Sequence, residues 1–280
     1  MKCIILAAGY ATRLYPLTEN FPKPLLEVAG RSILDRLLDD LSATGLIDEY
    51  IVVTNHKFAG IFEKWAEGTA SECLPLRSIP PSKLGPSRSC GHGRPQASEA
   101  VPSARITILD DGTSSNDSRL GAVRDILFAI RERGIDDDAF VMAGDNLLSF
   151  SLKGFLEYCR EKGASCIMRY AEPDERRLHK SGIVEVGEDD RVLSMEEKPA
   201  EPKSHWCCPP FYFYTREDLA RVEEAIADGC GTDAPGSLAA WLSAHSAVYA
   251  WPMPGPRYDI GTLENYEEVK KIFRYDLRQN

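Results

Sequence analysis

Short apolar strands alternate with helices in the first half of the chain, and this order restricts the fold more than any other feature of the sequence. The apolar run 2–7 predicts a buried strand. Ser32, with Asp35 three residues later, predicts the start of a helix. The apolar side chains of that helix share one face: Ile33, Leu34, Leu37, Leu38 and Leu41. A strand over 49–54 and a helix over 58–66 follow, so the order predicts right-handed βαβ units with parallel strands.

Residues 69–103 interrupt this order. The segment is rich in Pro and Ser, and its few apolar residues follow neither a helical nor a strand period. We interpret it as a flexible or disordered insertion at the surface of a single domain that spans residues 1–280.

Strands and helices resume after the insertion and are more mixed. Strands are predicted over 105–109, 139–144, 165–170, 182–186, 192–196, 211–214 and 248–251. Helices are predicted from Ser118 as N-cap, over 152–161, over 216–227 and from Leu263 onward. The fold class is therefore α/β: a doubly wound, Rossmann-like mixed sheet with a small β lobe facing the substrate.

Composition excludes several classes of protein. The chain has 280 residues and a net charge of -10, which argues against a nucleic-acid partner. No apolar run is long enough to span a membrane, and the N-terminus lacks the pattern of a signal peptide. The eight Cys are scattered without a Cys-x-x-Cys pair, which indicates reduced thiols and no structural zinc. We expect a cytoplasmic protein with no membrane association; a homo-oligomer is compatible with the sequence.

The loop after the first strand carries the strongest chemical signal. Ala8 and Gly9 let backbone N–H groups approach a ligand closely. Arg13 and Lys23 place two cations on the same loop, which three Pro residues stiffen. Such a loop suits a polyphosphate, although it is neither a P-loop nor a dinucleotide fingerprint. A solvated basic loop is the alternative that these residues alone leave open.

The segment from Leu6 to Leu26 resembles the signature loop of the sugar-phosphate nucleotidyltransferases, also called nucleoside-diphosphate-sugar pyrophosphorylases. Three further motifs match in the family's order: Gly144-Asp145-Asn146, Glu196-Glu197-Lys198-Pro199 and Asp259-Ile260-Gly261-Thr262. The resemblance implies the nucleotide-diphospho-sugar transferase fold and the joining of a nucleoside triphosphate to a sugar 1-phosphate with release of pyrophosphate. One departure is Tyr10-Ala11, where many members have a second glycine.

The resemblance also implies roles for the residues at these motifs. Arg13, Lys23 and Lys198 would be catalytic. The nucleotide-binding set would be Leu6, Ala8, Gly9, Asn116, Gly121 and Asp145, and the substrate-binding set Gly144, Glu197 and Lys198. Asp145 and Asp259 would hold Mg²⁺, a hard cation that prefers carboxylate oxygens. Asp145 follows a buried strand, at the edge where open α/β sheets bind ligands, although an Asp after Gly is often only a turn residue. The base that Asn116 and Gly121 would meet stays open.

Two other functions compete with nucleotide-sugar synthesis. The aromatic strand 211–214, with Trp206 upstream, could form a cage for a quaternary ammonium group, as a CTP-dependent cytidylyltransferase of phosphocholine or a related amino-alcohol phosphate would need. Core packing is the simpler interpretation of these rings. The third hypothesis is a non-catalytic regulatory protein that binds nucleotide sugars, which the joint presence of Arg13, Lys23, Asp145 and Asp259 disfavours.

Overall fold

A parallel block of four strands forms the N-terminal part of a ten-stranded sheet. The computed structural model describes residues 1–72 and 104–276. The block runs in the order β6 (Ala139–Ala143), β1 (Lys2–Leu6), β4 (Glu49–Thr54) and β5 (Arg105–Asp110), and each adjacent pair is parallel. The carboxyl ends of these strands therefore meet at one edge of the sheet, as the βαβ order predicts.

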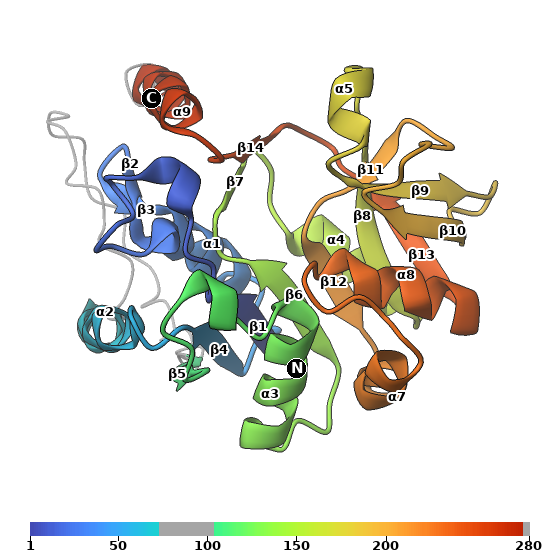
Figure 1. The fold of residues 1–280 in the computed structure, drawn as a ribbon, viewed down its shortest axis with the longest axis horizontal. Coiled ribbons are helices and arrows are strands. Elements are labelled where there is room, and N and C mark those ends of the chain that lie inside the picture. The colour runs from blue at the N-terminus through green and yellow to red at the C-terminus, as the bar shows by residue number, and fades with distance from the viewer. Residues whose placement is uncertain (73–103, 277–280) are drawn as a thin grey trace, which may run out of the picture.

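The second half of the chain extends the same sheet and makes it mixed. β12 (Phe211–Tyr214) lies antiparallel between β6 and β8 (Ser165–Ala171), and β13 (Val248–Pro252) pairs in parallel with β8. Beyond β8 the order continues through β11 (Trp206–Cys208), β9 (Gly182–Val186) and β10 (Val192–Glu197). These strands form a lobe on the right of Figure 1, continuous with the central sheet.

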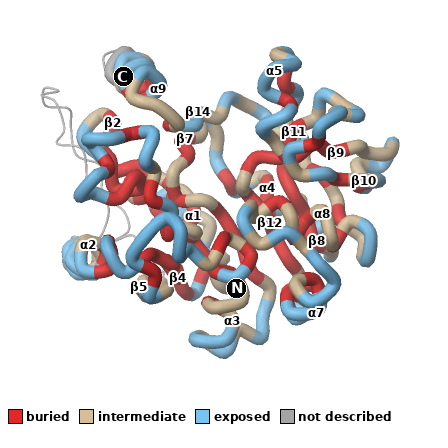
Figure 2. Tube along the Cα trace, in the orientation of Figure 1, coloured by how far each residue is buried: buried red, intermediate tan, exposed pale blue. Residues whose placement is uncertain are grey.

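Helices cover both faces of the sheet, so it is doubly wound. One buried cluster packs α1 (Ile33–Ser42), α2 (Ala59–Glu72) and α4 (Lys153–Lys162) against the strands. A second cluster packs α3 (Ala122–Arg133), α7 (Val222–Ala227) and α8 (Gly236–His245) on the opposite face. The buried tube segments in Figure 2 follow the strands between these two layers. The predicted fold class is thus confirmed.

A small ribbon brings the C-terminal part of the chain back to the parallel block. β7 (Asn146–Leu148) and β14 (Arg257–Asp259) pair antiparallel, with Asp259 opposite Asn146. Leu147 and Tyr258 pack on a third cluster, which includes residues of α9 (Leu263–Asp276) and of the β2 (Glu27–Val28) and β3 (Arg31–Ser32) hairpin. The register leaves the other face of the ribbon to Asn146, Arg257 and Asp259.

Local capping explains where α1 begins and why one helix prediction is wrong. Ser32 Oγ accepts a hydrogen bond of 3.0 Å from the backbone N of Asp35, as predicted for α1. Ser118, in contrast, ends a 3₁₀ turn, η3 (Asn116–Ser118), in which its hydroxyl bonds to Ser115. α3 begins only at Ala122 because the carbonyls at 232 and 233 accept its first N–H groups.

Other boundaries also differ from the predictions. Residues 69–72 belong to α2, and the rest of the predicted insertion lies outside the described residues. The single helix predicted over 216–227 is two, α6 (Arg216–Leu219) and α7, with a bend between them that lets Leu219 and Val222 both reach the core. α5 (Glu175–Leu178), α8, β2, β3, β7, β11 and β14 were not predicted. Across 1–72 and 104–276, no helix is both long enough and apolar enough to cross a membrane.

Candidate active site

Lys23 is the centre of the polar cluster at the carboxyl edge of the sheet. Its Nζ lies 2.7 Å from Asp145 Oδ2 and 3.5 Å from Asp259 Oδ1. The Lys23 side chain is only 10% exposed, whereas Asp145 and Asp259 are 32% and 54% exposed. Three residues from distant parts of the sequence therefore converge, and their carboxylates face solvent on one side of a buried ammonium.

Gly144 packs closely against residues beside this cluster. Gly144 joins β6 to Asp145, and a Cβ on it would lie 3.1 Å from Ile5 Cγ2 and 3.4 Å from the Pro24 ring. A side chain at position 144 would therefore push Ile5 away by a few tenths of an ångström, whereas glycine accommodates the present packing of Ile5 and Pro24. Gly144 thus has a packing role, and its predicted substrate contact stays a prediction.

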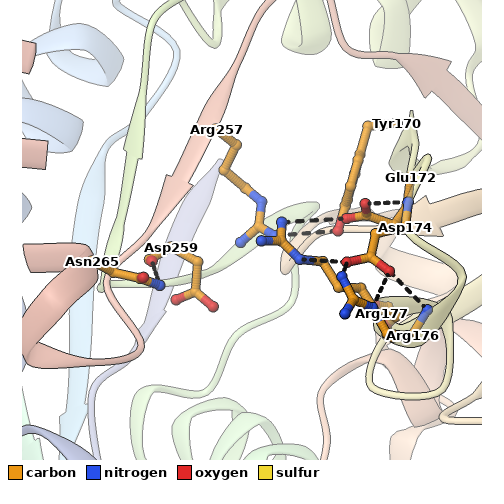
Figure 3. A network of polar contacts seen from close by, with 9 residues as sticks. Tyr170, Glu172, Asp174, Arg176, Arg177, Arg257, Asp259 and Asn265 are labelled. Atoms are coloured by element: carbon orange, nitrogen blue, oxygen red, sulfur yellow. Dashed lines mark hydrogen bonds and ion pairs between the residues drawn. The ribbon is translucent and has the colours of Figure 1, made fainter. Parts of the chain in front are cut away.

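Asn146 and Arg257 extend the cluster, and the sequence alone did not single out Arg257. Asn146 Nδ2 donates to Asp145 Oδ1 at 2.8 Å, and Arg257 Nη1 donates to Asn146 Oδ1 at 2.6 Å. Arg257 and Asp259 leave β14 toward the same side, and Asn265 donates to the carbonyl of Asp259 (Figure 3). The only sequence signal for Arg257 is its position two residues before Asp259, which becomes informative once β14 is known to be a strand.

The signature loop presents its small residues and one free cation. The carbonyl of Leu6 accepts from Gly144 N at 3.3 Å, and the carbonyl of Ala8 accepts from Asn55 Nδ2 at 2.9 Å. Gly9 is exposed, and nothing lies within 4 Å of a Cβ built on it. Arg13, in η1 (Thr12–Leu14), is exposed and has no ion-pair partner in 1–72 or 104–276. An anionic ligand can therefore reach both the Gly9 backbone and Arg13.

Ala11 marks the departure from the family pattern noted in the sequence. Its φ of 46° is left-handed, a conformation that glycine adopts without strain and alanine does not. The Ala11 carbonyl accepts from Thr18 Oγ1 at 2.8 Å, which holds the turn despite this strain. The backbone geometry thus explains why glycine suits this position.

The predicted base-binding residues lie on the segment between β5 and α3. Tyr10 Oη donates to the carbonyl of Thr113 at 3.1 Å and so ties this segment to the signature loop. Asn116 is exposed in η3, and its Oδ1 accepts from Arg119 at 3.0 Å. Gly121 has a φ of 91°, and a Cβ on it would lie 2.5 Å from the carbonyl oxygen of Thr232. Packing alone therefore requires Gly121; the base contacts of Asn116 and Gly121 stay predictions.

The predicted acceptor residues lie at the end of β10. Gly182 and Gly236 leave space for the Glu197 carboxylate, whose Oε2 would be 2.8 Å and 2.2 Å from a Cβ at these positions. Burial raises the pKa of Glu197, and the charge of Lys198 opposes this shift. Within the described residues no hydrogen-bond donor reaches the carboxylate, so it can accept from a ligand. Lys198 is exposed with a φ of 52°, and its N–H bonds to the carbonyl of Ser181 at 3.0 Å.

The site thus has two parts that the described residues do not join by a direct contact. Lys23, Asp145 and Asp259 form one part, at the end of the parallel block, and Glu197 with Lys198 forms the other, on the lobe. A substrate pair that reacts here has to bridge them.

A family model described as "Nucleotidyl transferase" matches residues 2–274. The chain belongs to the nucleotidyl transferase family. The family resemblance predicted from the signature loop and the three later motifs is therefore confirmed, as is the enzyme class that it implies.

Two curated relatives and one solved structure indicate the branch of the nucleotidyl transferase family that this chain resembles. A UTP–glucose-1-phosphate uridylyltransferase of Haloferax volcanii is 24% identical over 288 aligned residues, which cover 100% of this chain and 99% of the relative. A glucose-1-phosphate thymidylyltransferase of Mycobacterium tuberculosis is 28% identical over 236 residues, 82% of this chain and 67% of the relative. A UDP-glucose pyrophosphorylase solved with UDP-glucose has a TM-score of 0.75 at 16% identity, covering 98% of each chain, and so shares the fold.

The acidic residues of this nucleotidyl transferase fit a divalent cation that also binds substrate. No group of three or more His, Cys, Asp or Glu side chains placed to hold a metal occurs in the described parts of the chain. Asp145 and Asp259 nevertheless reach one ammonium together, so two carboxylates already lie close to each other. Mg²⁺ commonly takes one or two protein carboxylates and completes its shell with phosphate and water. The two carboxylates therefore suit a divalent cation that completes its shell with phosphate and water.

Proposed function

We propose that this chain joins a nucleoside triphosphate to a sugar 1-phosphate, releases pyrophosphate and so makes a nucleoside-diphosphate sugar. The observation that carries the proposal is the contact of Lys23 with both Asp145 and Asp259. One buried cation and two carboxylates from three separate motifs are the groups that phosphoryl chemistry at a metal-bound triphosphate requires.

The donor side would hold the triphosphate. Arg13 is exposed and unpaired within the described residues, so we assign it to the β- and γ-phosphates that leave as pyrophosphate. Lys23 is fixed by its two carboxylates, and we assign it to the α-phosphate. Mg²⁺ held by Asp145 and Asp259 would neutralise charge on the triphosphate and on the departing pyrophosphate. Backbone groups at Ala8 and Gly9 would complete the cradle.

The acceptor side would hold the sugar phosphate. Lys198 would bind its phosphate, and the half-buried carboxylate of Glu197 would accept a hydrogen bond from a sugar hydroxyl. The phosphate monoester is itself the nucleophile and attacks the α-phosphorus in line, so no general base is needed. Rate acceleration then comes from positioning and charge neutralisation.

The aromatic strand does not support the phosphocholine alternative. All four rings of β12 are buried in the two cores, and Tyr212 and Tyr214 stack with ring centroids 5.9 Å apart. Trp206 is already covered by the Arg169 guanidinium, 4.5 Å from its ring. The four rings of β12 therefore belong to the core, and Arg169 occupies one face of the half-buried Trp206 ring, in agreement with core packing. The activities named for the relatives make UTP and dTTP with glucose 1-phosphate the first pairs to test.

We further propose that residues 1–280 form one domain and that the enzyme is cytoplasmic.

The proposed roles are tested by single substitutions assayed for pyrophosphate release with Mg²⁺. Lys23→Ala and Asp145→Asn should each lower kcat by about 100-fold or more, since each removes one preorganised charge contact. Lys153→Ala is the matched control, because Lys153 is exposed on α4 and pairs only with Glu157 among the described residues. Its rate should stay within about twofold of wild type. Near-normal rates for Lys23→Ala or Asp145→Asn, with the fold intact by circular dichroism, contradict the assigned role.

A further inference from the structure

We propose that Arg257 is a positioning residue, which orients the Asp145 carboxylate by fixing the side-chain amide of Asn146. This inference rests on the proposed function, in which Asp145 holds the metal.

Arg257, Asn146 and Asp145 form a continuous chain of hydrogen bonds beside one face of the β7–β14 ribbon. Asn146 lies opposite Asp259 in the register, and Arg257 lies two residues before Asp259, so the side chains of Asn146, Arg257 and Asp259 share that face. Arg257 Nη1 donates to Asn146 Oδ1 at 2.6 Å, and Asn146 Nδ2 donates to Asp145 Oδ1 at 2.8 Å. Asn146 is only 1% exposed, so water cannot replace either bond easily.

The guanidinium determines which way the amide points. Arginine can only donate hydrogen bonds, so the oxygen of Asn146 has to face Arg257 and the NH₂ group has to face Asp145. A flipped amide would place two donors against each other and its oxygen against the carboxylate. Because Lys23 holds Oδ2 of Asp145 while Asn146 holds Oδ1, the carboxylate has one favoured orientation.

Arg257 is itself held by Tyr170 of β8 and not by an acid. Its guanidinium lies 5.4 Å from the centroid of the Tyr170 ring, and Nη2 donates to Tyr170 Oη at 3.4 Å (Figure 3). In residues 1–72 and 104–276, Arg257 forms no ion pair. Among the described residues, its partners are the Asn146 amide, which it orients, and the Tyr170 ring and hydroxyl, which support it. Arg257 thereby links β8 to the Asp145 carboxylate at the end of the parallel block.

The test measures metal affinity directly as well as activity. Mn²⁺ is titrated into wild type, Arg257→Met and Asp145→Asn. Electron paramagnetic resonance then quantifies the Mn²⁺ that stays free in solution. Loss of an outer contact to a metal ligand typically lowers affinity 10- to 100-fold, so Arg257→Met should raise the Mn²⁺ dissociation constant about 10-fold or more. The Mg²⁺ concentration for half-maximal pyrophosphate release should rise in parallel, while the KM for the acceptor stays within about twofold. Arg257→Lys, which keeps one donor, should restore part of the affinity.

Two further variants separate positioning from simple destabilisation. Arg131→Met is the matched control, since Arg131 pairs with Glu223 at the surface between α3 and α7, and its Mn²⁺ affinity should equal wild type. Asn146→Ala combined with Arg257→Met should weaken Mn²⁺ binding no more than Asn146→Ala alone, because both changes break the same chain. Thermal unfolding of each variant reports whether the fold survives.

The outcomes distinguish this inference from the proposed function. If Asp145→Asn leaves Mn²⁺ binding unchanged, the metal assignment in the proposed function fails. If Asp145→Asn weakens binding and Arg257→Met does not, the positioning role of Arg257 is wrong. A raised acceptor KM with unchanged Mn²⁺ affinity in Arg257→Met also overturns it, and instead indicates that Arg257 binds the acceptor directly.

Discussion

Replacing Asp125 with asparagine should make the free energy of unfolding much less dependent on pH. Asp125 lies in the first turn of α3, is 5% exposed, and its Oδ1 has no hydrogen-bond partner. Burial, with a smaller contribution from the Asp111 carboxylate, raises the pKa of Asp125 from 3.8 to about 7. Asp125 therefore holds a proton in the folded protein at pH values where the unfolded chain has lost it.

The sign and size of the effect follow from this shift. The folded state binds more protons than the unfolded state between about pH 4 and 7, so stability falls as pH rises through this window. The shift of Asp125 from 3.8 to about 7 is roughly three pKa units, and each unit is worth about 1.4 kcal/mol. Between about pH 4 and 7, the free energy of unfolding should thus fall by on the order of 4 kcal/mol more in wild type than in Asp125→Asn.

Urea unfolding at a series of pH values, followed by tryptophan fluorescence, measures this difference. The slope of the free energy of unfolding against pH is the informative quantity, because any pH-independent cost of burying the amide cancels from this slope. Asp117→Asn, which changes an exposed carboxylate of η3, is the control and should keep the wild-type profile. Parallel profiles for wild type and Asp125→Asn would refute the buried, proton-binding state of Asp125.

Three further predictions concern Gly121, the left-handed Ala11 and the carboxylate of Glu197. Gly121→Ala should lower the free energy of unfolding by about 3 kcal/mol in urea titrations, from the strain of its positive φ and the overlap with the Thr232 carbonyl; a loss of nucleotide affinity with stability unchanged would contradict this. Ala11→Gly should raise that free energy by about 0.5–1 kcal/mol, as relief of left-handed strain exceeds the added chain entropy; a destabilised variant would show that the methyl group packs usefully. Glu197→Gln should raise the KM for the sugar phosphate about 10-fold, through the loss of a charged hydrogen bond, and leave the KM for the triphosphate within about twofold; equal changes in both would count against an acceptor role.

The sequence predicted those parts of the fold and site that depend on local pattern. The strands β1, β4, β6 and β12 consist of apolar runs with clear ends, and Ser32 caps α1 with its own side chain. That Lys23, Asp145 and Asp259 belong to one site was implied by the family resemblance that their motifs carry, and the structure brings the three side chains into contact.

The features that the sequence did not predict depend on contacts between distant residues. β14 is three residues long, too short for an alternating pattern, so the position of Arg257 on the face of Asp259 could not be inferred. α3 begins at Ala122 and not at Ser118 because the loop at 232–233 accepts its first N–H groups. The same loop requires glycine at 121, which the sequence suggested only as a base contact.

Formation of a nucleotide sugar by the wild-type protein tests the central claim most directly. The protein is incubated with Mg²⁺ and each common nucleoside triphosphate, paired with glucose 1-phosphate, mannose 1-phosphate or phosphocholine, and products are quantified by mass spectrometry together with pyrophosphate. We predict one nucleoside-diphosphate sugar formed in a one-to-one ratio with pyrophosphate, and no product from phosphocholine. Product from phosphocholine alone, or triphosphate binding without any pyrophosphate release across all pairs, would contradict the proposed reaction.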